Sequence, residues 1–421
     1  MPIDPPPATP PAGTGAAGGR PHPLARLRDL AVRRPPLVLA AVAAAALLAL
    51  LALLVAGVGA ASVVAARAGD DGAGKWQAPP SLGPGSPPVP TPAPVPSTSG
   101  PDPAAVSLSA TGDIILGDTG SLPAADGAGF FDGVAGSLAA DLVMGNLEQP
   151  LTDDTGFEKC GEDSSGCHAF RAPPGYAAHL REAGFDLLNL ANNHGNDYGP
   201  QGRANTQAAL DDHGLAYTGD RDQITVLDVA GTAVAVVGFS AYGWTNDLND
   251  LAQAEDVVSR AVGQADLVVV QVHLGAEGAD QTRVRPGPET FFGEPRGDPM
   301  AFARAVIDAG ADLVVGHGPH VLRGLEFYEG RLIAYSLGNF AGGGGTLNAD
   351  GNLGLGAVLK VSLTPDGDFA GGQLVSTHMY DAGLPVVDPE QRSLDLIREV
   401  SGLDFPDTGA RLGPAGAISV P

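Results

Sequence analysis

The sequence predicts an α/β fold with buried sheets, formed by residues 105–388 of the 421-residue chain. The first observation is a series of short, nearly continuous apolar runs, such as 265–275 and 311–320, which is typical of strands buried on both faces. The second is that helical patterns such as 298–310 lie between the runs, each ending near a Gly that suits a helix C-terminal cap. Alternation of such strands and helices favours the α/β class.

Each predicted strand ends in a cluster of polar residues. In chain order, the strands with their polar loops are 106–113, 141–148, 185–194, 232–242, 265–275 and 311–320. The predicted helices are 173–184, 199–214 and 298–310. The last segment, 389–421, is weakly patterned and contains prolines, so we expect it to form a C-terminal tail.

Residues 37–66 contain no charged side chain, and the run is longer than the roughly 20 residues that a helix needs to cross a bilayer. We predict an uncleaved transmembrane anchor, because a secretory signal has a shorter apolar region; the small residues Ala60, Ala61 and Ser62 leave cleavage open. Arginines are concentrated in 1–36, before the span. The positive-inside rule therefore places the N-terminus in the cytoplasm and the main domain outside the cell membrane.

The segments on either side of the predicted anchor lack a pattern that could build a core. We expect 1–36 to be a disordered basic segment and 67–104, rich in Pro, Gly and Ser, to be a linker. The formal net charge of the chain is −25, which argues against nucleic acid as a partner. An acidic body would suit metal cations, although acidic surfaces also serve solubility alone.

The chain has two cysteines, Cys160 and Cys167, which lie close together in the sequence. Outside the cytoplasm, such a pair is expected to form a disulfide that closes a short loop. Metal binding is the alternative, with the neighbouring His168 as a third ligand, but that set would be incomplete.

The polar residues at the strand ends are the main functional pattern. Loops beyond the carboxyl ends of parallel strands converge on one crevice, so these residues would meet there if the strands are parallel. Carboxylate and amide oxygens together with imidazole nitrogens suit a divalent ion such as Mn²⁺, Fe²⁺ or Zn²⁺. The candidate residues are Asp113, Glu148, Asn193, His194, His273, His317 and His320.

The motifs that contain these residues resemble the poly-γ-glutamate capsule synthesis (CapA) family. They occur in the family's order between residues 107 and 340, and include TGDIILG, DLVMGNLEQPLTD, FRAPP, ANNHGNDYG, VVVQVHLGAE, GHGPHVL and RLIAYSLGNF. The family is similar to the calcineurin-like metallophosphoesterases. The resemblance implies a four-layer α/β/β/α sandwich of the metallo-dependent phosphatase type, with one or two divalent metal ions that activate water for attack on phosphorus.

The resemblance also implies a role for each candidate. Asp113 matches the first metal-binding aspartate, and Glu148 stands where a bridging carboxylate is expected. Asn193 would bind metal through its amide oxygen, and His194 would act as a general acid or electrostatic stabiliser. The remaining ligand histidines would be His273, His317 and His320.

The chain departs from these patterns at several positions. Ile115 replaces the histidine of the superfamily's D-x-H motif, which removes one metal ligand. Gly318 and Pro319 separate the final histidines by one residue more than usual, so either histidine could bind. Asp118 stands where many relatives carry Arg, which grips phosphate bidentately. A one-metal or weakly occupied site therefore stays open, and Asn339 either supports the mouth of the site or forms a structural turn.

A Pro/Gly-rich insertion is flanked by Arg283, Arg285 and Arg296. It could form a lid over the crevice, but we favour a plain surface loop.

Two functional hypotheses follow. The first is a membrane-anchored, extracytoplasmic, metal-dependent hydrolase that acts on an anionic capsule or envelope polymer, or on a phosphorylated precursor, with a capsule synthetase and exporter as partners. The second is a non-catalytic component that binds or guides the polymer in an assembly complex. The missing D-x-H ligand and Asp118 favour the second hypothesis, whereas retention of the other polar strand-end residues favours the first.

Overall fold

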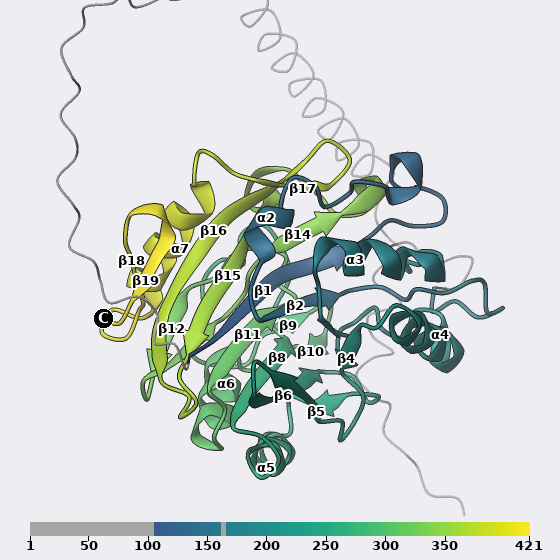
Figure 1. Cartoon of the computed structure of the whole chain (residues 1–421). Helices are drawn as coiled ribbons and strands as arrows, with labels where there is room; N and C mark the ends of the chain where they lie inside the picture. The colour runs from purple at the N-terminus through teal and green to yellow at the C-terminus, as the bar shows by residue number, and fades with distance from the viewer. Residues whose placement is uncertain (1–104, 161–165) are drawn as a thin grey trace, which may run out of the picture. The chain divides into compact units, whose positions relative to one another are not determined.

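A computed structural model describes residues 105–160 and 166–421 (Figure 1). The predicted cytoplasmic segment 1–36, anchor 37–66 and linker 67–104 lie outside the described residues. Within the described ranges, no helix combines the length and the apolar content that crossing a membrane requires.

The first of two large sheets contains both parallel and antiparallel strands. Its order is β18 (Arg411–Leu412), β19 (Ala417–Ser419), β16 (Phe369–Tyr380), β15 (Leu355–Leu363), β1 (Val106–Ile115), β2 (Leu142–Leu147), β3 (Leu187–Asn189) and β4 (Ala216–Thr218), with β14 (Asn339–Gly342) beside β1 and β17 (Leu384–Val387) beside β16. Strands β1 to β4 run parallel to one another, while β15 and β16 are antiparallel. The parallel half directs the ends of β1, β2 and β3 to one edge of the sheet.

The second sheet is parallel at its centre. Its order is β12 (Leu325–Tyr328), β13 (Arg331–Ala334), β11 (Leu313–His317), β8 (Leu267–His273), β6 (Thr232–Ser240) and β5 (Thr225–Val229), with β7 (Asn246–Asp247) beside β6. Strands β6, β8, β11 and β13 are parallel, so their carboxyl ends also share one edge. A separate hairpin consists of β9 (Thr290–Phe291) and β10 (Glu294–Pro295).

The helices are between 4 and 14 residues long. They are α2 (Ala135–Leu138), α3 (Ala177–Ala183), α4 (Gly199–Asp212), α5 (Leu251–Val262), α6 (Pro299–Asp308) and α7 (Arg392–Asp404), with 3₁₀ turns η2 (Ala124–Gly127), η3 (Pro174–Tyr176), η4 (Gly343–Gly345), η5 (Gly351–Gly354) and η6 (Pro414–Gly416). The Asp298 carboxylate accepts a hydrogen bond from the Ala301 amide at 3.0 Å, which caps α6. Helix α6 lies within the predicted range 298–310, and α4 lies within 199–214, whereas α5 was not predicted.

Three hydrophobic clusters show how the elements are layered. Along β8, Val269 packs into a cluster between the two sheets, while Val268 and Val270 pack outward against α5 and α6. On the outer face of the first sheet, Leu180 of α3 and Leu210 of α4 pack against the strands. Helices therefore cover the outer faces of two sheets that pack face to face, as Figure 1 shows for α5 and α6. This arrangement confirms the predicted α/β class.

The predicted C-terminal tail at 389–421 is wrong. Helix α7 packs against the cluster between the sheets through Leu394 and Ile397, and Ser393 Oγ donates a hydrogen bond to the Gly356 carbonyl at 2.7 Å. Strands β18 and β19 extend the first sheet beyond β16. The weak sequence pattern has a physical cause, because strands of two or three residues carry too few positions to show alternation.

Candidate metal centre

Strand register brings the candidate residues from the two sheets together. Asp113, near the end of β1, pairs with Asn146 of β2 and with Asn339 of β14. At the corresponding edge of the second sheet, His317 at the end of β11 pairs with His273 at the end of β8. The Gly318 amide lies 3.3 Å from Asp113 Oδ2, so the loop after β11 reaches the first sheet.

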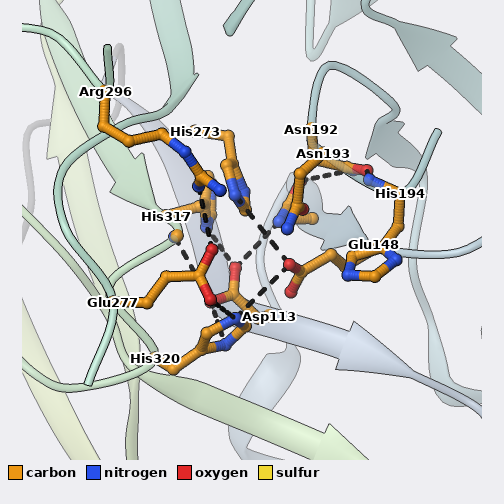
Figure 2. A network of polar contacts seen from close by, with 12 residues as sticks. Asp113, Glu148, Asn192, Asn193, His194, His273, Glu277, Arg296, His317 and His320 are labelled. Carbon is orange, nitrogen blue, oxygen red and sulfur yellow. Dashed lines mark hydrogen bonds and ion pairs between the residues drawn. The ribbon is translucent and has the colours of Figure 1, made fainter. Parts of the chain in front are cut away.

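His320 lies between the two carboxylates of the first sheet (Figure 2). Its Nδ1 is 3.3 Å from Asp113 Oδ2, and its Nε2 is 3.5 Å from Glu148 Oε1. Asn339 Oδ1 lies 2.8 Å from the same Nδ1, and Asn339 Nδ2 donates to the Leu353 carbonyl at 3.0 Å. Asn339 therefore orients an imidazole of the site, which favours its predicted supporting role.

The two residues between the final histidines explain their unusual spacing. Gly318 has φ +108°, and a Cβ at this position would lie 3.0 Å from the His273 ring, so glycine permits both the backbone conformation and the close approach. His317 Nδ1 then lies 3.8 Å from Asp113 Oδ1, and His317 Nε2 is 3.2 Å from Gln271 Oε1. Both His317 and His320 consequently face the site, rather than one of them alone.

Several buried polar atoms at this convergence lack a hydrogen-bond partner among the described residues. They include both carboxylate oxygens of Glu148, both ring nitrogens of His273, Nδ1 of His317 and Oδ1 of Asn193. Buried polar groups are normally paired, and leaving one unpaired costs roughly 1–3 kcal/mol. Ligand atoms of Asp113, Glu148 and His320 lie within 4.8 Å of one another. An unpaired O/N set of this kind fits a divalent cation.

Burial and the charges of neighbouring groups shift the pKa values of the site's carboxyls and histidines, some upward and others downward. Burial raises the pKa of Glu148 well above its usual range, and the nearby Asp113 charge adds to this effect. Burial alone would also raise the pKa of Asp113, but its contact with His320 and the charges of nearby histidines hold it low. Burial lowers the pKa of His317 to about 4 and that of His273 well below its usual range. Burial opposes the charged form of His320, but the two carboxylates raise its pKa.

His194 lies at the side of the site, where Asp197 and Lys159 contact its imidazole. Its Nδ1 is 2.7 Å from Asp197 Oδ2, and Lys159 Nζ lies 2.6 Å from the other oxygen of Asp197 and 3.2 Å from His194 Nδ1. Burial lowers the pKa of His194, and the hydrogen bond that the ring donates to Asp197 opposes that shift. The Asp197 carboxylate therefore fixes the orientation of the imidazole.

The loop that carries His194 depends on Asn192, an asparagine without a predicted role. Asn192 Oδ1 accepts a hydrogen bond from the His194 amide at 3.1 Å, and Asn192 Nδ2 donates to the Leu147 carbonyl at 2.9 Å. The first asparagine of ANNH thus builds the loop. Figure 2 shows Asn193 beside it, on the side of the site that also holds Glu148.

Two charged residues of the site were not predicted to belong to it. Glu277 Oε2 lies 3.8 Å from His320 Nε2, and Arg296 Nη1 donates to Glu277 Oε1 at 2.9 Å. The preferred interpretation of the insertion as a surface loop is wrong for Arg296, which is only 4% exposed. Arg283 instead pairs with Asp404, and Arg285 is exposed. Glu277 falls within the motif VVVQVHLGAE, four residues after His273. Its position in this motif is the sequence feature that could have indicated that it belongs to the site.

A cavity of about 350 Å³ adjoins the candidate metal centre. His194, Glu277 and His320 line its polar side, while Phe170, Phe291 and Leu347 line its apolar side.

Cys160 and Cys167, which were predicted to pair, are joined by a disulfide with their Cα atoms 5.7 Å apart. Cys160 directly follows Lys159, so the disulfide adjoins the segment that contacts His194.

The fold and this site define an α/β protein with a buried candidate metal centre between the strand ends of two sheets. The chain belongs to the bacterial capsule synthesis protein PGA_cap family, whose family model matches residues 107–343, more than half of the chain. The predicted resemblance to the CapA family is thereby confirmed.

Curated relatives agree with this family. The chain is 34% identical over 223 residues to the capsule biosynthesis protein CapA of Bacillus anthracis, covering 48% of this chain and 50% of that protein. It is 33% identical over 219 residues to the PGA biosynthesis protein CapA of Bacillus subtilis (strain 168), covering 48% and 53%. The chain thus spans about half the length of these relatives. A crystal structure of a Staphylococcus aureus protein in complex with alpha-ketoglutarate covers 70% of this chain and 58% of its own, with 11% identity and a TM-score of 0.39.

Proposed function

We propose that this protein is a metal-dependent hydrolase of the metallophosphoesterase type that acts in the synthesis of a capsule or another cell-envelope polymer. The observation that carries the proposal is the convergence of buried, unpartnered oxygen and nitrogen ligands at the facing strand ends. Family membership supports the polymer context, because the two Bacillus relatives are named for capsule and PGA biosynthesis. The helix–sheet–sheet–helix packing supports assignment to the metallo-dependent phosphatase type.

The residues that would hold one or two ions of Mn, Fe or Zn are Asp113, Glu148, Asn193, His273, His317 and His320. A divalent ion bound there supplies Lewis-acid polarisation of a phosphoryl oxygen and lowers the pKa of water. The protein's own contribution is to keep these side chains unpaired and facing one another. The buried environment strengthens their attraction for a cation, because little water screens it.

His194 is the residue we assign to proton transfer. It lines the cavity, and Asp197 fixes its Nδ1 at 2.7 Å, which leaves the other ring nitrogen for a substrate in the cavity. Burial holds the pKa of His194 below its usual value, so the neutral imidazole is favoured near neutral pH, which fits a proton acceptor rather than the general acid that the resemblance implies. The positive Lys159 ammonium beside Asp197 acts in the same direction.

We further propose that the apolar segment 37–66 anchors the domain at the outer face of the cell membrane, with 67–104 as a spacer. The substrate would be an anionic polymer or its phosphorylated precursor, and a synthetase and exporter would be membrane partners. The strongly acidic chain makes nucleic acid a poor partner.

A non-catalytic polymer-binding component is the second candidate function. It is favoured by Ile115, which is buried at the site without offering a ligand, and by Asp118, which accepts a hydrogen bond from the Arg171 amide at 3.2 Å in place of a phosphate-binding arginine. The two candidates differ in what they require of the metal centre, since a polymer guide does not need a bound ion.

Elemental analysis of the purified full-length chain and of a His273→Ala, His317→Ala double variant tests the proposal. We expect near-stoichiometric Mn, Fe or Zn in the parent and almost none in the variant, because two ligands are removed together. A His213→Ala variant is the matched control, since His213 contacts the Ala209 carbonyl of α4 outside the site. A parent without metal after reconstitution would sink the hydrolase and leave the polymer-binding component.

A further inference from the structure

We propose that Glu277 is an additional ligand of the metal centre and that Arg296 is the residue that positions it. The proposal rests on the proposed metal centre and extends its ligand set to a carboxylate from the loop after β8. Ile115 lies two residues after Asp113 on β1 and is buried at the edge of the cavity, where its apolar side chain offers no ligand atom. That part of the site therefore lacks a ligand from the first sheet, and Glu277 offers one from the second.

The position of Glu277 is the first argument. Its Oε2 lies 3.8 Å from His320 Nε2, the same nitrogen that Glu148 Oε1 approaches at 3.5 Å. Asp113 Oδ2 lies 3.3 Å from the other nitrogen of that ring. Figure 2 shows the three carboxylates turned toward one imidazole. One imidazole cannot hydrogen-bond all three, so the arrangement calls for a cation with more than one open coordination position.

Unpartnered ligands beside Glu277 are an independent argument for a cation. Glu148 is fully buried and neither of its oxygens has a hydrogen-bond partner among the described residues. His273 is 1% exposed and its Nε2, also unpartnered there, faces Glu148 Oε1 at 3.9 Å. These groups are aimed into the space that Glu277 borders.

The third argument is that Arg296 holds the Glu277 carboxylate in one orientation. Arg296 Nη1 holds Glu277 Oε1 at 2.9 Å, which leaves Oε2 directed at the site. The Arg296 guanidinium is itself enclosed, lying 5.5 Å from the centre of the Phe291 ring and 5.9 Å from that of Tyr242. Its Nη2 pairs with Glu294 at 3.2 Å. Burying an arginine is costly unless it is paired, and here the pairing aims one carboxylate oxygen.

Mn²⁺ binding to the metal-free full-length chain tests the assignment. Dissociation constants would be obtained from free Mn²⁺ by electron paramagnetic resonance, with metal content by elemental analysis. We expect Glu277→Gln to weaken Mn²⁺ binding at least 10- to 100-fold, because changing even an outer-shell partner of a metal ligand typically has an effect of that size. We expect Arg296→Lys to weaken it by roughly 10-fold, because a single ammonium cannot hold Glu277 in the same orientation.

Glu294→Gln is the matched control, since it makes the same chemical change in the other carboxylate paired with Arg296. Glu294 is 53% exposed at its side chain and does not line the cavity, so Mn²⁺ affinity should stay within about twofold of the parent. Thermal unfolding of the metal-free variants checks that each is folded.

The outcomes separate this inference from the proposed function. A parent that binds Mn²⁺ together with a Glu277→Gln variant of equal affinity would overturn the inference and leave the metal centre intact. Equal weakening in Glu277→Gln and Glu294→Gln would also overturn it, because the effect would then come from the packing of Arg296. A parent that binds neither Mn²⁺ nor Zn²⁺ would overturn the metal centre itself.

Discussion

Two buried carboxylates in this molecule have opposite surroundings. Glu148 is fully buried, and both of its oxygens lack a hydrogen-bond partner among the described residues. Asp388 is 2% exposed, but it accepts hydrogen bonds from Ser376 Oγ at 3.1 Å, from the Arg392 amide at 2.9 Å and from the Glu390 amide at 3.2 Å. The Arg392 side chain adds two further bonds at 3.1 and 3.2 Å.

The difference separates a carboxylate whose hydrogen bonds the fold satisfies from one that the proposed metal centre would use. Asp388 joins the end of β17 to the start of α7, and its bonds form within the chain itself. Glu148 has only the longer contacts with His320 at 3.5 Å and His273 at 3.9 Å and no hydrogen bond among the described residues, which fits the proposed metal centre. Glu326 behaves like Asp388, because Tyr335 Oη and Thr408 Oγ1 donate to it at 2.7 and 2.9 Å.

The largest effect on stability should come from Asp388→Asn. The amide keeps the size of the side chain but removes the charge and turns one acceptor into a donor that faces Ser376, Arg392 or Glu390. Breaking a buried, fully bonded carboxylate should lower the free energy of unfolding by about 2–4 kcal/mol. Chemical denaturation of the full-length chain measures it. A loss below about 0.5 kcal/mol would show that α7 is held by packing alone.

A smaller effect of opposite sign is expected from Glu148→Gln in the metal-free protein. Because the native carboxylate is buried without a hydrogen-bond partner among the described residues, replacing it with a neutral amide should leave the free energy of unfolding unchanged or raise it by about 1 kcal/mol. The same denaturation experiment measures it, and a loss comparable to that of Asp388→Asn would contradict the comparison.

Added metal should bring the stability losses of the two variants closer together. At a free concentration 100 times the dissociation constant, a bound ion stabilises the parent by about 2.7 kcal/mol, and Glu148→Gln should lose most of that gain. Asp388→Asn should retain it, because Asp388 lies outside the candidate site.

The strand pattern of the sequence was enough to predict most residues of the candidate site. Asp113, Glu148, His273, His317 and His320 were all found because each follows a recognisable apolar strand, and parallel strands bring their ends to one edge. The α/β class followed from the same alternation. Family resemblance then supplied the roles that spacing alone does not define.

Other features depended on contacts between distant segments. Arg296 sits 19 residues after Glu277, in an insertion without periodicity, so nothing local indicates that the two side chains meet. Helix α7 is held by Asp388 and Ser393, and β18 and β19 are defined by pairing with each other and with β16. Asn192 and Asn193 are adjacent and chemically identical, and only the path of the loop separates their roles.

The smallest expected effect is the pH dependence of the contribution of Asp388. Burial would raise the pKa of this carboxyl, but hydrogen bonds from the side chain and amide of Arg392 and from the Glu390 amide outweigh burial and lower it. Because the folded pKa lies below the unfolded value of about 3.9, the stabilisation is fully present above that value and is lost as the pH falls through the folded pKa. The stability difference between the parent and Asp388→Asn should therefore be constant from pH 7 to about 5 and shrink below about 4, by about 1.4 kcal/mol for each unit of pKa shift.

His378 Nδ1 lies 3.8 Å from Asp388 Oδ1 and is present in both proteins. Its contribution to stability therefore cancels in the comparison, apart from its interaction with the side chain at position 388. Denaturation curves of the two proteins between pH 7 and 3.5 measure this, and a difference that grows on acidification would show that the folded pKa of Asp388 is raised.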